Sequence, residues 1–436
     1  MVYAVVGSNY GDEGKGLAVD YLAALSCGAA EPRAGAELSP YANSGPHADV
    51  ELSPRAGASP RAATGTKPGW TLVIRHNGGA QSGHTVEPWR AAGTDVMPGA
   101  PRRFVFHELS SGSFRHADTY WAETFLPDLY KLREELTAFR KAAGFAPRIL
   151  ASPRTCITTI DDVLLNMLFE SLRGKKRHGS CGMGINEADL RGKAGFGVSL
   201  KEVKGGTHET LYQKLRENRQ NYTLKRMEEG RTETSEYNSL LSDDTVLWNY
   251  ALEVMRAAEN VELEEGDFWR DYENLIFEGG QGLRLDAEYK AGLPHVTASR
   301  TGLTNVAALT RKWRVKIDEA IYVTRTYVTR HGAGPLPGEI PADAVPEVLP
   351  FFKPDQTNLA NPWQGSLRYA PHDSVGELLR VIREDLKNAE PVPCVSLFVT
   401  HLDETGGCML IGDRMIPLDE FLDEPEVRRV FQKIYR

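Results

Sequence analysis

Short runs of apolar and β-branched residues recur along the chain, and each is followed by a glycine-rich or acidic segment. The runs cover residues 2–6, 71–74, 275–277, 320–324 and 395–399. Apolar runs without polar alternation are typical of strands that are buried on both faces, as in parallel sheets. Ligands of open α/β sheets bind at the carboxyl edge of the strands, so the segments after these runs are candidate ligand sites.

Helical periodicity fills much of the chain between these runs. Apolar residues recur at helical spacing over residues 161–173, 211–229, 246–258 and 375–387, and a helix-like run covers residues 17–25. The faces of these helices that are rich in Arg and Glu are expected to be solvated surface. The pattern predicts an α/β fold with a large, mostly parallel central sheet surrounded by helices.

One region, residues 26–69, lacks this pattern and is rich in Ala, Pro, Gly and Ser. It also repeats itself, because Pro-Arg-Ala-Gly-Ala occurs at 32–36 and 54–58, and Glu-Leu-Ser-Pro at 37–40 and 51–54. Such a segment buries too little apolar surface to offset the entropy of ordering it. We expect a mobile surface insertion, with a lid or an assembly element as the functional alternative.

Composition is typical of a soluble enzyme. The 436 residues are 41% hydrophobic and 25% charged, and the net charge of −8 disfavours a general nucleic-acid binder. The five cysteines lack metal-ligand spacing and suit a reducing compartment. No apolar stretch approaches the roughly 20 residues of a membrane span, and no signal-like segment is recognised. We therefore expect a cytoplasmic protein without membrane contact.

The most informative segment is the loop Gly11-Asp12-Glu13-Gly14-Lys15-Gly16, between the first apolar run and the first helical run. Small residues on a strand-to-helix turn let backbone N–H groups point at a phosphate, and the helix N-terminus adds positive potential. Asp12 and Glu13 next to an anion suggest a role in holding Mg²⁺ or in moving a proton. The alternative is a glycine-rich turn that happens to hold two acids.

A second loop, residues 77–85, follows the run at 71–74 and reads Asn-Gly-Gly-Ala-Gln-Ser-Gly-His-Thr. It places His84 in a glycine-rich bend that a ligand can approach closely. Alone, such a histidine could simply be a donor that caps a turn. Together, the two loops resemble the signature loops of the adenylosuccinate synthetase family, whose members condense a 6-oxopurine nucleotide with aspartate.

Further segments resemble those of the family in the same order along the chain. They are His107-Glu-Leu-Ser-Ser-Gly112, Gly179-Ser-Cys-Gly-Met-Gly-Ile185, Phe277-Glu-Gly-Gly-Gln-Gly282, Val296-Thr-Ala-Ser299 and Thr329-Arg-His-Gly-Ala-Gly-Pro335. The resemblance covers residues 1 to about 25 and about 70 to 405. It implies one adenylosuccinate synthetase-like domain over residues 1–436, related to P-loop folds, and a homodimer in which an arginine crosses to the partner subunit. Arg191 is the candidate for that arginine.

The resemblance also implies roles for individual residues. Asp12 is expected to take the purine N1 proton, and His84 to stabilise and protonate O6. Asp12 and the Gly83 carbonyl are the expected Mg²⁺ ligands, and Arg368 the expected clamp for aspartate. The donor phosphates and base are assigned to Gly11, Asp12, Glu13, Gly14, Lys15, Gly16, Gly83, Thr85 and Asp403, and the purine nucleotide to Asn9, Gln81, Ser82, Ser180, Cys181, Gln281 and Thr297.

Departures from the family pattern bear on the substrates. The family's guanine-reading Thr-Lys-Leu-Asp is Thr-His-Leu-Asp at residues 400–403, and its C-terminal Ser-Thr-Gly-Pro-Asp-Arg segment has no match here. A site with fewer guanine-specific partners admits ATP or dATP as well as GTP. This combination resembles phage-encoded relatives that act on dGMP and form N6-succino-2-amino-2′-deoxyadenylate. Because Asp12 is retained, the reaction of IMP with GTP is the alternative.

Two other classes of protein remain open at this stage. A switch-type NTPase would use residues 11–16 and 400–403 without a second substrate, but it leaves His84 and Gln281 unexplained. A nucleotide-binding scaffold would use the repetitive insertion as an interaction arm, but it has no need of a paired base and acid. Phosphate release that requires both aspartate and a 6-oxopurine nucleotide would exclude both classes.

Overall fold

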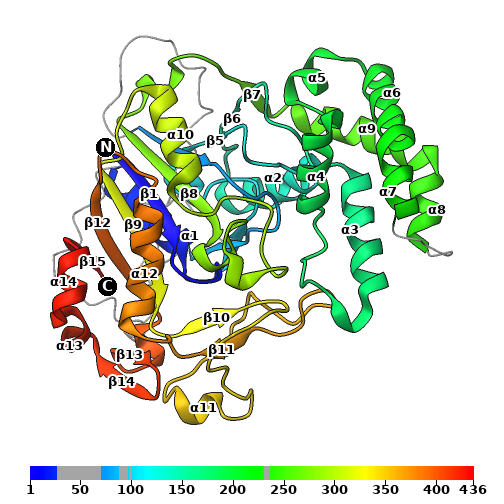
Figure 1. Cartoon of the computed structure of the whole chain (residues 1–436). Helices are drawn as coiled ribbons and strands as arrows, with labels where there is room; N and C mark the ends of the chain where they lie inside the picture. Colours follow the sequence, from blue (N-terminus) through cyan, green and yellow to red (C-terminus); the bar gives the residue numbers. More distant parts are fainter. Residues whose placement is uncertain (27–69, 88–96, 98–100, 230–235) are drawn as a thin grey trace.

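The computed structural model describes residues 1–26, 70–87, 97, 101–229 and 236–436. Most of the insertion expected at residues 26–69 lies outside these ranges. Within them, a nine-stranded sheet in which every neighbouring pair is parallel forms the centre of the molecule (Figure 1). Its strands, in spatial order, are β15 (Lys433–Tyr435), β12 (Cys394–Thr400), β9 (Glu319–Arg325), β1 (Val2–Gly7), β8 (Asn274–Gly282), β2 (Thr71–Arg75), β5 (Asp118–Trp121), β6 (Ile149–Ala151) and β7 (Val261–Leu263).

The five strands expected from the sequence are all present, and four lie side by side as β12, β9, β1 and β8, followed by β2. Alternate residues of β1 face opposite layers. Ala4 and Val6 pack with helices α10 and α12, whereas Val5 packs with α1. Burial on both faces explains why these strands read as continuous apolar runs. The helices that cover the sheet are α1 (Lys15–Ser26), α2 (Leu129–Ala143), α10 (Leu303–Trp313) and α12 (Val375–Leu386).

A group of helices lies at one side of the sheet, away from the two chain ends (Figure 1). It consists of α3 (Ile160–Arg173), α4 (Ile185–Arg191), α5 (Leu200–Gly205), α6 (His208–Asn218), α7 (Leu224–Glu229), α8 (Glu236–Ser242) and α9 (Asp244–Ala258). The helix expected over 211–229 is in fact α6, a π-helical turn at Arg219–Thr223, and α7. In that turn Arg219 points inward and pairs with buried Asp161.

The remaining elements are small and lie at the margins of the sheet. They are the two-stranded pairs β3 (His84–Val86) with β4 (Phe104–Phe106), β10 (Val328–Arg330) with β11 (Arg368–Ala370), and β13 (Cys408–Ile411) with β14 (Arg414–Pro417), and the helices α11 (Val345–Val348), α13 (Leu418–Asp423) and α14 (Pro425–Val430). None of the helices in the described ranges is long and apolar enough to cross a bilayer.

Candidate active site

The loop 11–16 follows β1 at the carboxyl edge of the sheet, as expected, and its last two residues, Lys15 and Gly16, form the start of α1. Gly11 has φ +109° and Gly14 has φ +97°, conformations that residues with a Cβ rarely adopt. A Cβ on Gly14 would lie 3.1 Å from the Thr400 side chain, so the loop also packs closely on the end of β12. These constraints explain why the sequence has glycine at both positions.

The carboxylates of Asp12 and Glu13 in this loop have different surroundings. Glu13 is turned inward, where it accepts hydrogen bonds from the backbone N–H groups of Asn9 (2.9 Å) and Gly11 (2.8 Å). Lys15 is also buried, and its Nζ lies 2.7 Å from the Gly11 carbonyl and 3.2 Å from Glu13. The expectation that both carboxylates face an anion was therefore wrong for Glu13, since its side chain braces the loop.

Asp12 is the acid of this loop whose carboxylate remains available to a ligand. Burial raises the pKa of its carboxyl, and the positive charge of Arg325 opposes this effect. Arg325 also donates from Nε to the backbone carbonyl of Asp12 at 2.5 Å. In the described ranges no residue donates a hydrogen bond to the Asp12 carboxylate, which suits a proton acceptor or a Mg²⁺ ligand. Mg²⁺ sites often use one or two carboxylates together with substrate phosphates.

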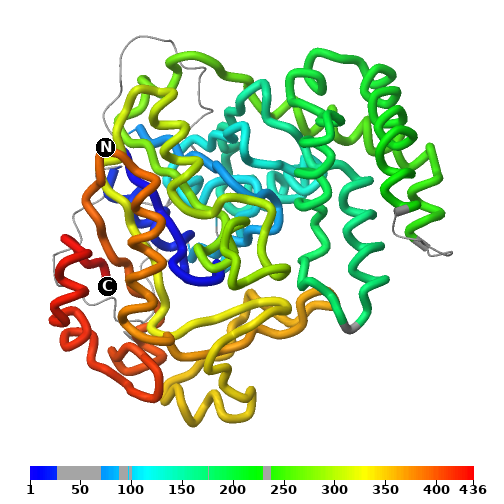
Figure 2. The backbone as a smooth tube through the Cα atoms, in the orientation of Figure 1, coloured from blue at the N-terminus to red at the C-terminus, as the bar shows by residue number. Residues whose placement is uncertain are grey.

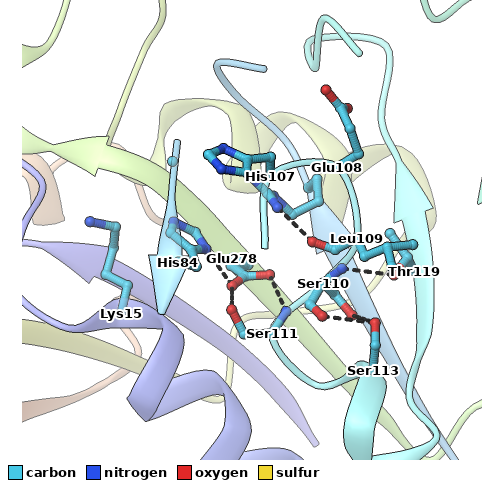
Figure 3. A network of polar contacts seen from close by, with 12 residues as sticks. Lys15, His84, His107, Glu108, Leu109, Ser110, Ser111, Ser113, Thr119 and Glu278 are labelled. Carbon is cyan, nitrogen blue, oxygen red and sulfur yellow. Dashed lines mark hydrogen bonds and ion pairs between the residues drawn. The ribbon is translucent and has the colours of Figure 1, made fainter. Parts of the chain in front are cut away.

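His84 begins β3 and lies against the end of the loop, since a Cβ on Gly16 would be 3.0 Å from the His84 Cβ. Its Nδ1 is 2.5 Å from Oε1 of Glu278 in β8, and Glu278 also accepts hydrogen bonds from the Ser111 hydroxyl and backbone N–H (Figure 3). Burial alone would raise the pKa of Glu278, but His84, Arg75 and Ser111 lower it to about 2. The carboxylate is thus ionised and fixes the ring.

This pairing determines which ring nitrogen of His84 is available. Burial lowers the pKa of His84, and Glu278 opposes that shift. When Nδ1 donates to Glu278, Nε2 is left for a ligand, as an acceptor in the neutral ring and as a donor in the imidazolium form that the Glu278 charge stabilises. Within the described ranges, Nε2 is buried without a hydrogen-bond partner. The sequence had placed Glu278 in a motif without giving it a role.

Several amide and hydroxyl groups in the loops after β1 and β2 and at the end of β8 are buried and have no hydrogen-bond partner among the described residues. They are Asn9 Oδ1, Asn77 Nδ2, Gln81 Oε1 and Nε2, Ser82 Oγ and Gln281 Oε1. They lie close together, because a Cβ on Gly280 would be 2.6 Å from Ser82 Oγ and 3.5 Å from Asn77 Nδ2, and one on Gly11 would be 3.3 Å from the Gln281 Cα. Buried polar groups are nearly always paired, so this cluster fits a ligand with hydrogen-bond donors and acceptors.

Most members of this cluster were expected from the sequence, with the exception of Asn77. Its Oδ1 accepts a hydrogen bond from the Gly280 backbone N–H at 2.9 Å, which orients the Nδ2 group. The position of Asn77, directly before Gly78-Gly79 in the bend, was the signal that could have identified it. Thr85 follows His84 in β3. The Thr297 hydroxyl accepts a long hydrogen bond, 3.5 Å, from the Ser299 N–H within its own turn.

The segment that carries Ser180 and Cys181 follows α3 and is held by its surroundings. Ser180 Oγ donates to Asn166 Oδ1 at 2.7 Å and accepts from the Gly182 N–H at 3.2 Å, so its hydroxyl is already used. Burial raises the pKa of the Cys181 thiol to about 11, which keeps it neutral. Gln364 donates to the Gly179 carbonyl, and Figure 2 shows the two segments meeting below the helices.

The two arginines expected at the site differ in their availability. Arg368 in β11 donates to Glu339 at 2.8 Å and to the carbonyls of Gly332 (3.0 Å) and Gly334 (2.8 Å), so it already supports the turn after β10. Arg191 is buried and bound to Asp162 and to the Phe196 and Ile157 carbonyls. The expectation that Arg191 reaches a partner subunit was wrong, because its donors are satisfied inside the chain.

Asp403 lies near the other end of the loop 11–16. It follows β12, whose last residue, Thr400, donates to the Glu13 carbonyl at 2.8 Å. Asp403 Oδ2 is 2.7 Å from Nζ of Lys353. The parts of the chain that the structure describes contain no cluster of three or more His, Cys, Asp or Glu side chains suited to a metal.

Comparison with known proteins identifies the family. A sequence model of the family described as adenylosuccinate synthetase matches residues 67–352, which is more than half of the chain. The chain belongs to the adenylosuccinate synthetase family. Adenylosuccinate synthetases from Picrophilus torridus and Dichelobacter nodosus are 25% and 26% identical over 79% and 77% of this chain. The matched regions cover 66% and 64% of those relatives, which is less than two thirds of their length.

Solved structures show the same fold. The adenylosuccinate synthetase of Plasmodium falciparum, in a fully ligated state, aligns with a TM-score of 0.58 at 17% identity and covers 91% of this chain and 76% of its own. The succinoaminodeoxyadenylate synthetase of cyanophage S-2L, bound to dGMP and to dATP as an energy donor, aligns with a TM-score of 0.54 at 13% identity and covers 100% of this chain and 91% of its own. These likenesses confirm the predicted α/β fold.

Proposed function

We propose that the protein is a ligase that condenses L-aspartate with a 6-oxopurine deoxynucleotide, dGMP, and forms N6-succino-2-amino-2′-deoxyadenylate. ATP or dATP would supply the phosphoryl group, with Mg²⁺ bound. The observation that carries the proposal is the set of buried, unpartnered polar atoms on Gln81, Ser82, His84 and Gln281 beside the phosphate loop. Unpartnered donors and acceptors on segments beside the phosphate loop suit the polar edge of a purine.

The chemistry starts from the fact that O6 of a purine is a poor leaving group. Asp12 would take the proton from N1, which moves negative charge onto O6. O6 then forms a bond to the γ-phosphorus of the donor, and the bond from that phosphorus to the bridging oxygen breaks to release the nucleoside diphosphate. Backbone N–H groups of residues 11–16 would orient the phosphates, and positioning supplies much of the rate in such transfers.

In the second half of the reaction, the amine of aspartate attacks C6 and the C6–O6 bond breaks. O6 leaves as part of inorganic phosphate, and the amine loses a proton. His84, as an imidazolium stabilised by the Glu278 charge, would stabilise charge on O6 and donate its Nε2 proton as the phosphate departs, which returns the ring to the neutral form with Nδ1–H on Glu278. General acid and base groups of this kind each contribute about 10²- to 10⁴-fold. Mg²⁺ held by Asp12 and the Gly83 carbonyl would offset phosphate charge.

Arg368 is part of the proposal as the group that binds a carboxylate of aspartate. A guanidinium pairs well with a planar carboxylate, and Arg368 is only partly buried beside the turn at 332–334. To bind aspartate it would exchange its contact with Glu339, which is on the surface. A homodimer is also proposed, on the family resemblance alone, and a cytoplasmic location is proposed as the composition suggests.

The experiment that tests the function compares IMP, dIMP, GMP and dGMP as acceptors against ATP, dATP and GTP as donors, with aspartate and Mg²⁺. Product is identified by mass spectrometry and phosphate release is measured in parallel. The proposal expects the highest kcat/KM with dGMP and an adenine donor. A preference for IMP with GTP would support the ordinary family reaction instead, and phosphate release without aspartate would contradict a ligase.

A further inference from the structure

Two arginines share the carbonyl groups of the turn at 332–335, which follows β10. Arg330 donates from Nε to the carbonyl of residue 333 (3.1 Å) and from Nη1 to that of residue 335 (2.9 Å). Arg368 donates to the carbonyls between them, those of residues 332 and 334. The two arginines are opposite each other in the β10–β11 pair (Figure 1). The position of Arg368 therefore depends on a turn that Arg330 also holds.

Tyr10, the residue directly before the phosphate loop 11–16, packs against Arg330. The Arg330 Cζ lies 4.6 Å from the centre of the Tyr10 ring, which is a cation–π contact. The ring is 5% exposed and forms a small apolar cluster with Val328 of β10 and Ala370 of β11. Its hydroxyl donates to the carbonyl of residue 335 over 3.5 Å. Tyr10 thus connects the start of the phosphate loop to both strands of this pair.

The guanidinium of Arg330 is enclosed by these contacts. Arg330 is 1% exposed, and its Nη2 donates to the His295 carbonyl at 2.9 Å. A buried cation is stable only where its surroundings replace water, so the carbonyls and the Tyr10 ring determine where the guanidinium lies. A smaller aliphatic side chain at Tyr10 would remove the attractive ring face and leave a space beside Arg330. The guanidinium and the turn that it holds could then shift.

We propose that Tyr10 is a positioning residue for the aspartate site, because its ring holds Arg330 and, through the turn at 332–335, keeps Arg368 in place to bind a carboxylate. The inference deepens the proposed function and rests on it for the identity of the substrate. The place of Tyr10 in the sequence, next to the phosphate loop, would suggest an effect on the donor. Its packing predicts an effect on aspartate instead.

The test compares Tyr10→Leu and Tyr10→Phe with the unmodified full chain by steady-state kinetics, with Mg²⁺ and the acceptor and donor that give the highest activity. Tyr10→Leu should raise the KM for aspartate about tenfold, the effect of losing one buried contact of this kind. The KM for the donor should change by less than about twofold. Tyr10→Phe keeps the aromatic face and should behave like the unmodified protein. An unchanged KM for aspartate, an equal rise in both KM values, or the same rise in Tyr10→Phe would overturn the proposal.

Trp269→Leu is the matched control. Arg270 Cζ lies 4.9 Å from the centre of the Trp269 ring, and both residues precede β8, at the edge of the sheet opposite the phosphate loop. This substitution removes an aromatic ring beside an arginine but should leave both KM values unchanged. A rise in the KM for aspartate equal to that of Tyr10→Leu would count against the proposal, since it would not depend on the turn.

Hydrogen exchange separates this inference from the proposed function, because it needs no substrate. Backbone amides of residues 328–336 should exchange faster in Tyr10→Leu than in the unmodified protein, and no faster in Tyr10→Phe. Equal exchange in Tyr10→Leu would refute the positioning role even where aspartate product forms. If the unmodified protein forms no aspartate product with any acceptor, the proposed function fails, and faster exchange confined to Tyr10→Leu would still support the hold of Tyr10 on the turn.

Discussion

His84 and Glu278 form a buried pair in which Nδ1 of the imidazole and Oε1 of the carboxylate are 2.5 Å apart, although the residues are 194 positions apart in sequence. Ser111 binds the same carboxylate through its hydroxyl and its backbone N–H. The pair fixes the direction of Nε2 and provides negative charge to stabilise a proton on the ring. It links His84, the proposed general acid in β3, to strand β8, which also contains Gln281.

Glu278→Gln should lower kcat by about 10²-fold, within the range for an impaired general acid, with little change in the KM for the nucleotides. The amide can still accept from Ser111 but has no charge to hold a proton on His84. Steady-state kinetics check the prediction. Glu262→Gln, at the exposed middle position of β7, is the control and should leave kcat unchanged. Full activity in Glu278→Gln would show that the charge on Glu278 is dispensable.

Asp12→Asn should lower turnover by about 10³-fold or more, because the general base is lost. It should not lower thermal stability. Burial raises the pKa of Asp12, so its ionised form costs the folded state free energy that the amide does not. The melting temperature and the turnover are measured on the same preparation. Retained turnover would remove Asp12 from its role as base, and a large fall in melting temperature would mean that the carboxylate is mainly structural.

Gly280→Ala should weaken binding of the purine nucleotide. The added Cβ would lie 2.6 Å from Ser82 Oγ and 3.0 Å from the Asn77 carbonyl, so it would fill the space between unpartnered groups. We expect the KM for the 6-oxopurine nucleotide to rise about tenfold or more, and the KM for the triphosphate to change little. Gly192→Ala is the control, because nothing lies within 4 Å of its Cβ position. Equal effects of the two substitutions would contradict this placement.

Asp385 should make stability depend on pH. Burial raises its pKa to about 6, while its carboxylate accepts from the Leu303 N–H (2.9 Å) and the Tyr322 hydroxyl (2.9 Å). Because the folded state holds the proton more tightly than the unfolded chain, this contribution is complete below about pH 4 and is lost as pH rises through 6.

Asp385→Asn removes that titration. Its free energy of unfolding relative to the unmodified protein should increase by up to about 3 kcal/mol between pH 4 and pH 7, from the conversion of about two pKa units. Urea denaturation at several pH values measures the difference. A difference that stays constant across this range would show that Asp385 does not titrate there.

The strands and the phosphate loop could be predicted from the sequence because they depend on local signals. Apolar runs mark strands buried on both faces, and Gly11 and Gly14 mark a turn with positive φ. The sequence could not show that Glu13 folds inward while Asp12 does not, since neighbouring acids on a tight turn look alike. Nor could it pair His84 with Glu278 or Lys353 with Asp403, because such contacts depend on how distant segments pack.

The most direct test of the central claim follows the purine oxygen itself. The reaction is run with aspartate, Mg²⁺, unlabelled ATP and dGMP that carries ¹⁸O at position 6, and the released phosphate is analysed by mass spectrometry. If Asp12 and His84 act on the two ends of the N1–C6–O6 unit as described, one ¹⁸O atom appears in each phosphate. Phosphate without the label, released at the same rate when dGMP or aspartate is omitted, would contradict the account.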